Sequence, residues 1–292
     1  MGPMDTFSRS WALAKESYAV LRRVPSLVVF PILSSVATIL IMISFAVPTY
    51  MLTGGKNLQK IRPEVGYPVM FLFYFLTYFV VIFFNSAMVA CAYEGLQGRT
   101  PTVAFGMSAA WKRIGAILGW TAIAATVGIV LRTIAERTGL IGNIVVGLVG
   151  FAWNVATFFV VPVLVIEHGS PVNAVKKSSA MLKQTWGERI VVGVGVGAAM
   201  ALLAVLGFIP IVGGIALGSA TDSVAPMILL VIFGVVYLLV LATIGAALQG
   251  IFQTALYVYA ETGAVPSGFD SNTIQAAFKQ KQGALSRFQD RF

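Results

Sequence analysis

Apolar residues along this chain gather in six long runs, and short segments richer in charged residues separate them. A helix needs about 20 mainly apolar residues to cross the hydrocarbon core of a bilayer. The runs predict transmembrane helices at about 27–52, 68–93, 114–134, 140–166, 190–218 and 225–260. We therefore expect an all-α, polytopic membrane protein in which residues 1–292 form a single integral membrane domain.

The last two runs are longer than one crossing requires, so these helices must tilt, kink or project beyond the hydrocarbon. Pro210 lies inside the fifth run and is predicted to kink or end that helix. A second interpretation makes 208–218 a short re-entrant segment. Small residues at four-residue spacing predict close helix packing in the same run: they are Gly193, Gly197, Gly214 and Gly218.

A shared pattern follows the second, fourth and sixth runs. A glutamate and a glycine end each run, a proline follows, and apolar residues then recur every three or four positions up to an aromatic residue and a cation. The glutamates are Glu94, Glu167 and Glu261, and the prolines are Pro101, Pro171 and Pro266. This periodicity predicts amphipathic interfacial helices whose cations face anionic headgroups. After the fourth run, the predicted apolar face is Val172, Val175, Ser179, Leu182 and Trp186.

One interfacial helix plus one transmembrane hairpin is therefore a unit that occurs three times, at about 5–95, 100–168 and 170–262. A fourth, cytoplasmic interfacial helix at about 270–292 closes the chain. Each unit begins and ends on the same side of the membrane, so the three hairpin repeats are parallel. Inverted repeats are typical of many carriers, although parallel repeats also occur in transporters.

Composition agrees with the membrane class and explains the charge. Charged residues make up 11% of the chain, against about 25% in a soluble domain, which excludes a soluble enzyme, a disordered chain and a nucleic-acid-binding domain. The net charge is +9, and 15 Lys and Arg residues lie on the side that both termini share, against 5 on the other. Cytoplasmic loops carry the excess of Lys and Arg. We expect a multi-pass protein of the inner (cytoplasmic) membrane with both termini in the cytoplasm.

Basic and aromatic residues of the interfacial stretches are the candidate lipid contacts. They are Trp11, Arg22, Arg23, Trp111, Lys112, Arg113, Lys176, Trp186 and Lys279. The expected partners are membrane lipids with anionic headgroups, and a second copy of the chain or another protein. Nucleic acid is not expected, because the positive charge has a topological explanation.

The amide side chains within the runs include Asn85, Asn154, Gln249 and Gln253. They predict either a polar pathway shared by the repeats or interhelical hydrogen bonds that hold the bundle together. The boundary glutamates Glu94, Glu167 and Glu261 are candidate proton or cation ligands. The favoured interpretation is structural: they pair with interfacial cations such as Arg99, Lys112 or Lys176, or face the N-termini of the following helices.

Patterns typical of catalysis and metal binding do not occur in the sequence. There is no HExxH, no Ser-His-Asp arrangement with suitable placement and no pair of deep carboxylates. His168 is the one histidine and Cys91 the one cysteine, and neither belongs to a cluster with metal-ligand spacing. We therefore expect no enzyme, no cofactor, no metal site and no disulfide framework.

Three segments carry a resemblance to a known family: Ser10-Trp11, residues 30–34 (Phe-Pro-Ile-Leu-Ser) and the run from Pro162 to Ser178. On these residues the chain resembles an uncharacterised family of bacterial and archaeal six-span membrane proteins, described as a domain of unknown function. A looser similarity reaches the YciC-like inner-membrane proteins and the membrane domain attached to some glycerophosphodiesterases. These resemblances imply a fold and a location and leave the activity open.

A weaker similarity points to the CysZ-type sulfate permeases. It rests on the tryptophan-containing N-terminal helix, residues 30–33 and the pair Phe84-Asn85. Those proteins have a glycine after this pair and more carboxylates just beyond it, where this chain has Ser86, Ala90 and Cys91. The difference puts anion specificity in doubt, and no sulfate site is carried over.

Two functions fit the sequence. One is a non-catalytic membrane-organising or partner-binding protein, anchored by basic interfacial helices. The alternative is an oligomeric channel or permease for a small ion or solute, with a pathway near the four amides. The repeated amphipathic helices are used directly only by the first, which is therefore favoured.

Overall fold

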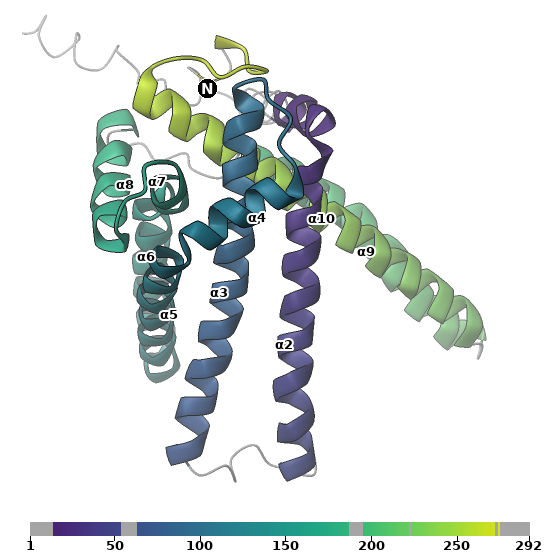
Figure 1. Cartoon of the computed structure of the whole chain (residues 1–292). Helices are drawn as coiled ribbons and strands as arrows, with labels where there is room; N and C mark the ends of the chain where they lie inside the picture. Colours follow the sequence, from purple (N-terminus) through teal and green to yellow (C-terminus); the bar gives the residue numbers. More distant parts are fainter. Residues whose placement is uncertain (1–13, 54–62, 187–194, 222–223, 272–273, 275–292) are drawn as a thin grey trace, which may run out of the picture. The chain divides into compact units, whose positions relative to one another are not determined.

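The computed structural model describes residues 14–53, 63–186, 195–221, 224–271 and 274 (Figure 1). The described residues form helices joined by turns. Residues 14–23 are helical, and the 3-10 turn η1 (Pro25–Val28) leads into α2 (Val29–Thr53). The remaining helices are α3 (Pro63–Leu96), α4 (Val103–Lys112), α5 (Ile114–Arg137), α6 (Leu140–Ala156), α7 (Val160–Ile166), α8 (Pro171–Trp186), α9 (Gly195–Thr221) and α10 (Val224–Thr262).

Six helical segments of the described chain are long and apolar enough to cross a membrane. They are Pro25–Met51, Glu64–Leu96, Ile114–Arg137, Gly142–Ile166, Met200–Ala220 and Val224–Thr262. The all-α, multi-pass prediction is thereby confirmed. The repeat arrangement and the amphipathic character of the interfacial helices stay predictions.

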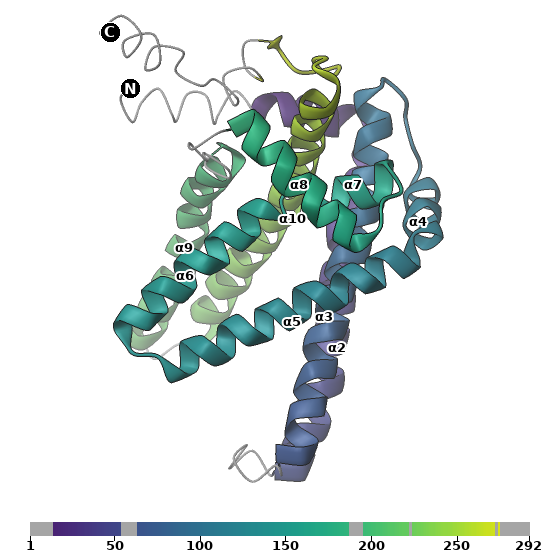
Figure 2. The same ribbon diagram turned by 90° about the vertical axis from the view of Figure 1, so that its left-hand side faces the viewer.

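The chain divides into two compact units. Val24–Ser179 forms one, here called the α3 unit, and Met1–Arg23 with Ala180–Phe292 forms the other, here called the α9–α10 unit. Within the first unit, α3 contacts α2, α4, α5 and α7. Figure 2 shows α4, α7 and α8 gathered around one end of this long helix. Within the second, α9 and α10 pack against each other along much of their length.

The fourth span is interrupted, although the sequence predicts one continuous helix over 140–166. Residues Thr157–Phe159 form a turn between α6 and α7. Pro162 explains the break, because its ring lacks an N–H and clashes with the carbonyl four residues earlier, here that of Phe158. Pro210, in contrast, lies within α9, so it does not end that helix. The structure has 208–218 as part of one helix and not as a re-entrant segment.

Burial changes abruptly along the second helix of each hairpin. In α3, no residue of Glu64–Val81 is buried, whereas most residues from Ile82 to Leu96 are. In α10, Gly234 is the one buried residue before Ala247, and most of Ala247–Tyr257 is buried. Along α6 and α7, burial begins at Val155 and is complete over Phe159–Val165. Each hairpin thus has one half with apolar surface exposed along its length and one half built like a protein core.

Candidate functional site

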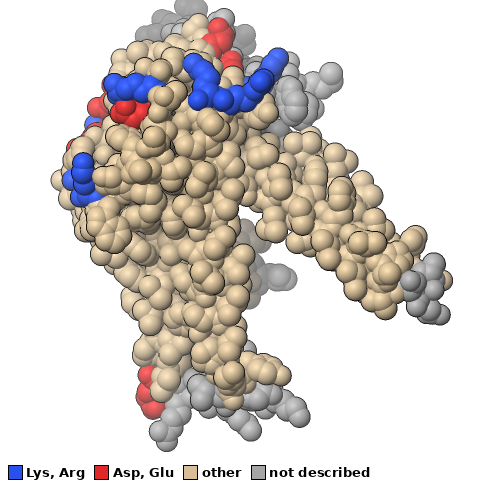
Figure 3. Space-filling view, turned by 45° about the vertical axis from the view of Figure 1, so that its right-hand side comes forward, with Lys and Arg blue, Asp and Glu red and all other residues tan. Residues whose placement is uncertain are grey.

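One end of the α3 unit, here called the basic end, carries more cations than carboxylates. Its described residues include five cations and two glutamates: Arg99, Lys112, Arg113, Lys176 and Lys177, with Glu94 and Glu167. The described charges at the opposite ends of the same helices are Glu64, Arg132, Glu136 and Arg137, which balance. Figure 3 shows the wide surface without charge that the apolar helices present beyond the cations.

Helix α4 is held on α3 by close contact. Thr102 caps its N-terminus, with the side-chain oxygen accepting from the N–H of Phe105 at 3.2 Å. A Cβ added to Gly106 would lie 2.7 Å from both the Ala87 carbonyl oxygen and Cys91 Sγ. A larger residue at position 106 would therefore push α4 away from α3. This docking places Trp111 and Lys112 at the end of α4, on the surface of the unit.

Helix α8 grips α7 at both ends through two successive residues. Lys177 Nζ lies 2.7 Å from Glu167 Oε2, just after the last residue of α7. Ser178 Oγ accepts the backbone N–H of Phe159 at 2.9 Å, just before the first. Ser178 is fully buried, so its hydroxyl bonds a backbone N–H inside the protein at the break in the span. Lys177 and Ser178 therefore fix α8 over the break.

Arg113 stabilises the fold and also contributes to the positive charge of the basic end. Its Nε donates to the Leu164 carbonyl at 3.2 Å, in the last turn of α7, where helix carbonyls lack an intrahelical partner. The chain then turns at His168, which has a φ of 62°. Arg113 is half-buried, so part of its guanidinium is committed within the protein.

Both carboxylates of the basic end are paired. Glu94 accepts two bonds from the Arg99 guanidinium, one of them at 3.0 Å. Glu167 pairs with Lys177 and not with Lys176, the residue before Lys177. Lys112 and Lys176 are exposed and have no ion pair among the described residues. These two lysines, here called the free lysines, give the basic end its uncompensated positive charge.

An aromatic residue accompanies the free lysines. The Trp111 side chain is 66% exposed, and its ring meets the Phe83 ring edge-on at 6.0 Å. Tryptophan beside lysine is typical of the interface between hydrocarbon and headgroups. On α8, the buried residues are Ala174, Ser178, Met181 and Leu182, while Val172 is 55% exposed. The apolar face predicted through Val172, Val175, Ser179, Leu182 and Trp186 is expected to contact lipid and stays a prediction.

The remaining predicted residues have mixed positions. Trp11 and Lys279 lie outside the described residues, as does the side chain of Trp186. Arg22, Arg23 and Glu261 are exposed in the α9–α10 unit. The amides fall two in each unit: Asn85 is half-buried and Asn154 exposed in one, and Gln249 and Gln253 are half-buried on α10. The shared polar pathway stays a prediction. Among the described residues, no three His, Cys, Asp or Glu side chains form a group that could hold a metal ion.

The family comparison covers most of this architecture. Residues 64–269, from the start of α3 to just beyond α10, match a family of unknown function, DUF6159. The chain belongs to this family. No curated protein and no solved structure matches it. The predicted resemblance to an uncharacterised membrane family is confirmed at this level, and the looser similarities to the YciC-like, glycerophosphodiesterase-associated and CysZ-type proteins stay predictions.

Sequence reasoning missed one structural element of the site in this family member. Ser178 was part of the resembling run but had no role assigned, because a serine in an amphipathic stretch has no distinctive signature. Pro162 was the available signal, since a proline inside a predicted span indicates freed backbone groups that another element must satisfy.

Proposed function

We propose that this protein is a non-catalytic organiser of the membrane, which gathers anionic lipids around the basic end of its α3 unit. The free lysines carry the proposal, because Glu94 and Glu167 already have cation partners and leave these two uncompensated. A lysine near an anionic surface contributes about 1 kcal/mol to attraction. Under this proposal the basic end faces the cytoplasm, where anionic headgroups and the positive-inside rule both favour it.

The test compares two doubly substituted proteins that lose the same charge. Lys112→Gln with Lys176→Gln removes two free lysines, and Arg132→Gln with Arg137→Gln removes two cations from the balanced opposite end. Each full-length protein is reconstituted in vesicles of zwitterionic lipid with a minority of fluorescent phosphatidylglycerol. Energy transfer from tryptophan to this lipid reports its enrichment around the protein.

We expect the lysine pair to lower phosphatidylglycerol affinity by about 25-fold, from about 1 kcal/mol for each residue. The arginine pair should change it little, and added salt should weaken wild-type enrichment because exposed charges are screened. Equal enrichment in both variants and the wild type would overturn the proposal. Solute flux that Asn85→Leu and Gln249→Leu abolish would support the channel alternative, and a protein captured through the lysines would support partner binding.

A further inference from the structure

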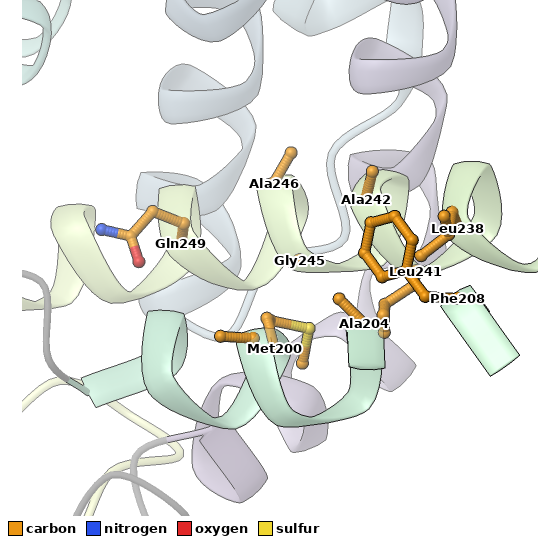
Figure 4. Close-up of a pocket in the computed structure, with 10 residues that line it drawn as sticks. Met200, Ala204, Phe208, Leu238, Leu241, Ala242, Gly245, Ala246 and Gln249 are labelled. Atoms are coloured by element: carbon orange, nitrogen blue, oxygen red, sulfur yellow. The ribbon is translucent and has the colours of Figure 1, made fainter. Parts of the chain in front are cut away.

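An open groove of about 710 Å³ lies between α9 and α10, within the α9–α10 unit. Figure 4 shows Ala204 of α9 and Ala242 and Ala246 of α10 along it, with Phe208 toward one end and Gln249 at the other. Among the described lining residues, Gln249 is the one with a polar side chain. The groove is therefore lined by apolar side chains and ends beside a single amide.

Rigid contacts beyond the groove hold its two walls. A Cβ added to Gly214 would lie 2.8 Å from Leu230 Cβ, and one added to Gly218 would lie 2.8 Å from Met227 Cβ. The Tyr237 hydroxyl also donates to the Leu203 carbonyl at 3.1 Å. Because the helices touch at backbone distance there, α9 and α10 cannot slide to close the space that the alanines leave.

The exposure of α10 places the amide relative to a bilayer. Helix α10 has 39 residues, or about 58 Å at 1.5 Å per residue, which is nearly twice the hydrocarbon thickness of about 30 Å. Its poorly buried part, Val224–Ala246, is about 34 Å long and matches one crossing. Gln249 follows this part by less than one turn. The amide thus lies where hydrocarbon gives way to the ester and headgroup region.

We propose that the groove binds one acyl chain of a membrane phospholipid, with the Gln249 amide bonded to the ester oxygens of that lipid. An apolar lining would leave the polar groups of a water-soluble ligand without hydrogen bonds. A carboxamide donates and accepts, which suits an ester carbonyl and a glycerol oxygen. The groove opens beside Ala242 and Ala246, both exposed, so a chain can enter sideways from the bilayer.

The size of the groove favours a lipid chain over a second copy of the protein. Its volume lies within the range of about 300–1,000 Å³ found for small-molecule sites. A helix with its side chains is about 10–12 Å across and would rest on the rim instead of filling the space. This proposal concerns the α9–α10 unit alone, so it stands or fails independently of the free lysines.

Photolabelling tests the groove in the full-length protein. The chain is reconstituted in phosphatidylcholine vesicles that contain a phospholipid with a photoreactive group on one acyl chain, and adducts are mapped by mass spectrometry. We expect adducts at groove positions such as Ala204 and Ala246 to exceed those at Val236 and Leu239 by at least fivefold. Val236 and Leu239 are exposed on α10 but do not line the groove.

Three variants complete the design. Ala242→Phe fills the groove and should reduce groove adducts to the level at Val236, while Val236→Phe adds the same ring outside the groove and should leave them unchanged. Gln249→Leu keeps the chain space, removes the amide, and should lower groove labelling several-fold. Uniform labelling of all exposed faces, meaning annular lipid only, would overturn the proposal. A photoreactive amino acid introduced at position 246 that cross-links to protein instead of lipid would also overturn the proposal.

Discussion

At the scale of single residues, polar side chains compensate for a backbone that a helical membrane protein rarely leaves open. In hydrocarbon, every backbone N–H and carbonyl must find a partner inside the protein. Ser178 bonds the Phe159 N–H at the break after α6, and Arg113 bonds the Leu164 carbonyl in the last turn of α7. The basic end therefore has a structural role as well as a positive charge.

The substitution Ser178→Ala tests the structural role of the Ser178 hydroxyl directly. Removing the hydroxyl deletes the buried hydrogen bond from the Phe159 N–H, which costs about 0.5–1.5 kcal/mol. The matched control is Ser179→Ala, because Ser179 Oγ bonds to the carbonyls of Val175 and Lys176 within its own helix. We expect the free energy of unfolding in mixed detergent micelles to fall for position 178 and to stay within about 0.5 kcal/mol of wild type for position 179. A similar loss at both positions would contradict this role of Ser178.

At the scale of helices, the glycines of α9 decide how the last hairpin packs. Gly214 is buried against α10, where an added Cβ would lie 3.2 Å from the Met227 carbonyl oxygen as well as close to Leu230. Gly213, the preceding residue, has open space at the same atom. Gly213 and Gly214 are the same type of residue, but only Gly214 lies on the face of α9 that contacts α10.

Gly214→Leu should therefore destabilise the α9–α10 pair while Gly213→Leu does not. Inserting a side chain into a packed interface costs about 1–3 kcal/mol, and here backbone atoms stand in the way. Exposed positions of a membrane helix accept leucine readily, because lipid is as apolar as leucine. Disulfide formation between Cys residues introduced at Gly218 and Met227, in a Cys91→Ala background, measures the approach of the helices. Equal cross-linking in both leucine variants would show that the helices do not pack at Gly214.

The same helices show what a sequence can predict in a membrane protein. The six spans were predictable because hydrocarbon selects apolar runs of a fixed length, and Gly214 with Gly218 was predictable because close helix approach requires small residues. Pro162 indicates a break in the fourth run, but the bounds of the turn at Thr157–Phe159 and the inward face of α8 were not predictable. Both depend on which backbone groups a distant element satisfies, and the pairing of Ser178 with Phe159 joins residues 19 positions apart.

At the scale of the whole molecule, the burial pattern recurs in all three hairpins and gives the amides a common setting. Asn85, Asn154 and Gln249 each lie within three residues of the point where burial begins. In the proposed orientation this point is the cytoplasmic edge of the hydrocarbon. An amide there can bond to lipid esters or to neighbouring backbone. Amides at equivalent positions of the three hairpins therefore do not by themselves require a pathway through the membrane.

The orientation itself is the last prediction, and two single-cysteine proteins test it in the Cys91→Ala background. Gln97→Cys reports the turn between α3 and α4, where Gln97 is exposed. Gly139→Cys reports the turn between α5 and α6, where an added Cβ meets open space. Because 15 of the 20 Lys and Arg residues lie on the predicted cytoplasmic side, a membrane-impermeant maleimide should label intact cells at position 139 and label position 97 only after the membrane is opened. The reverse order would place the free lysines outside the cell, away from the anionic leaflet that the proposed function requires.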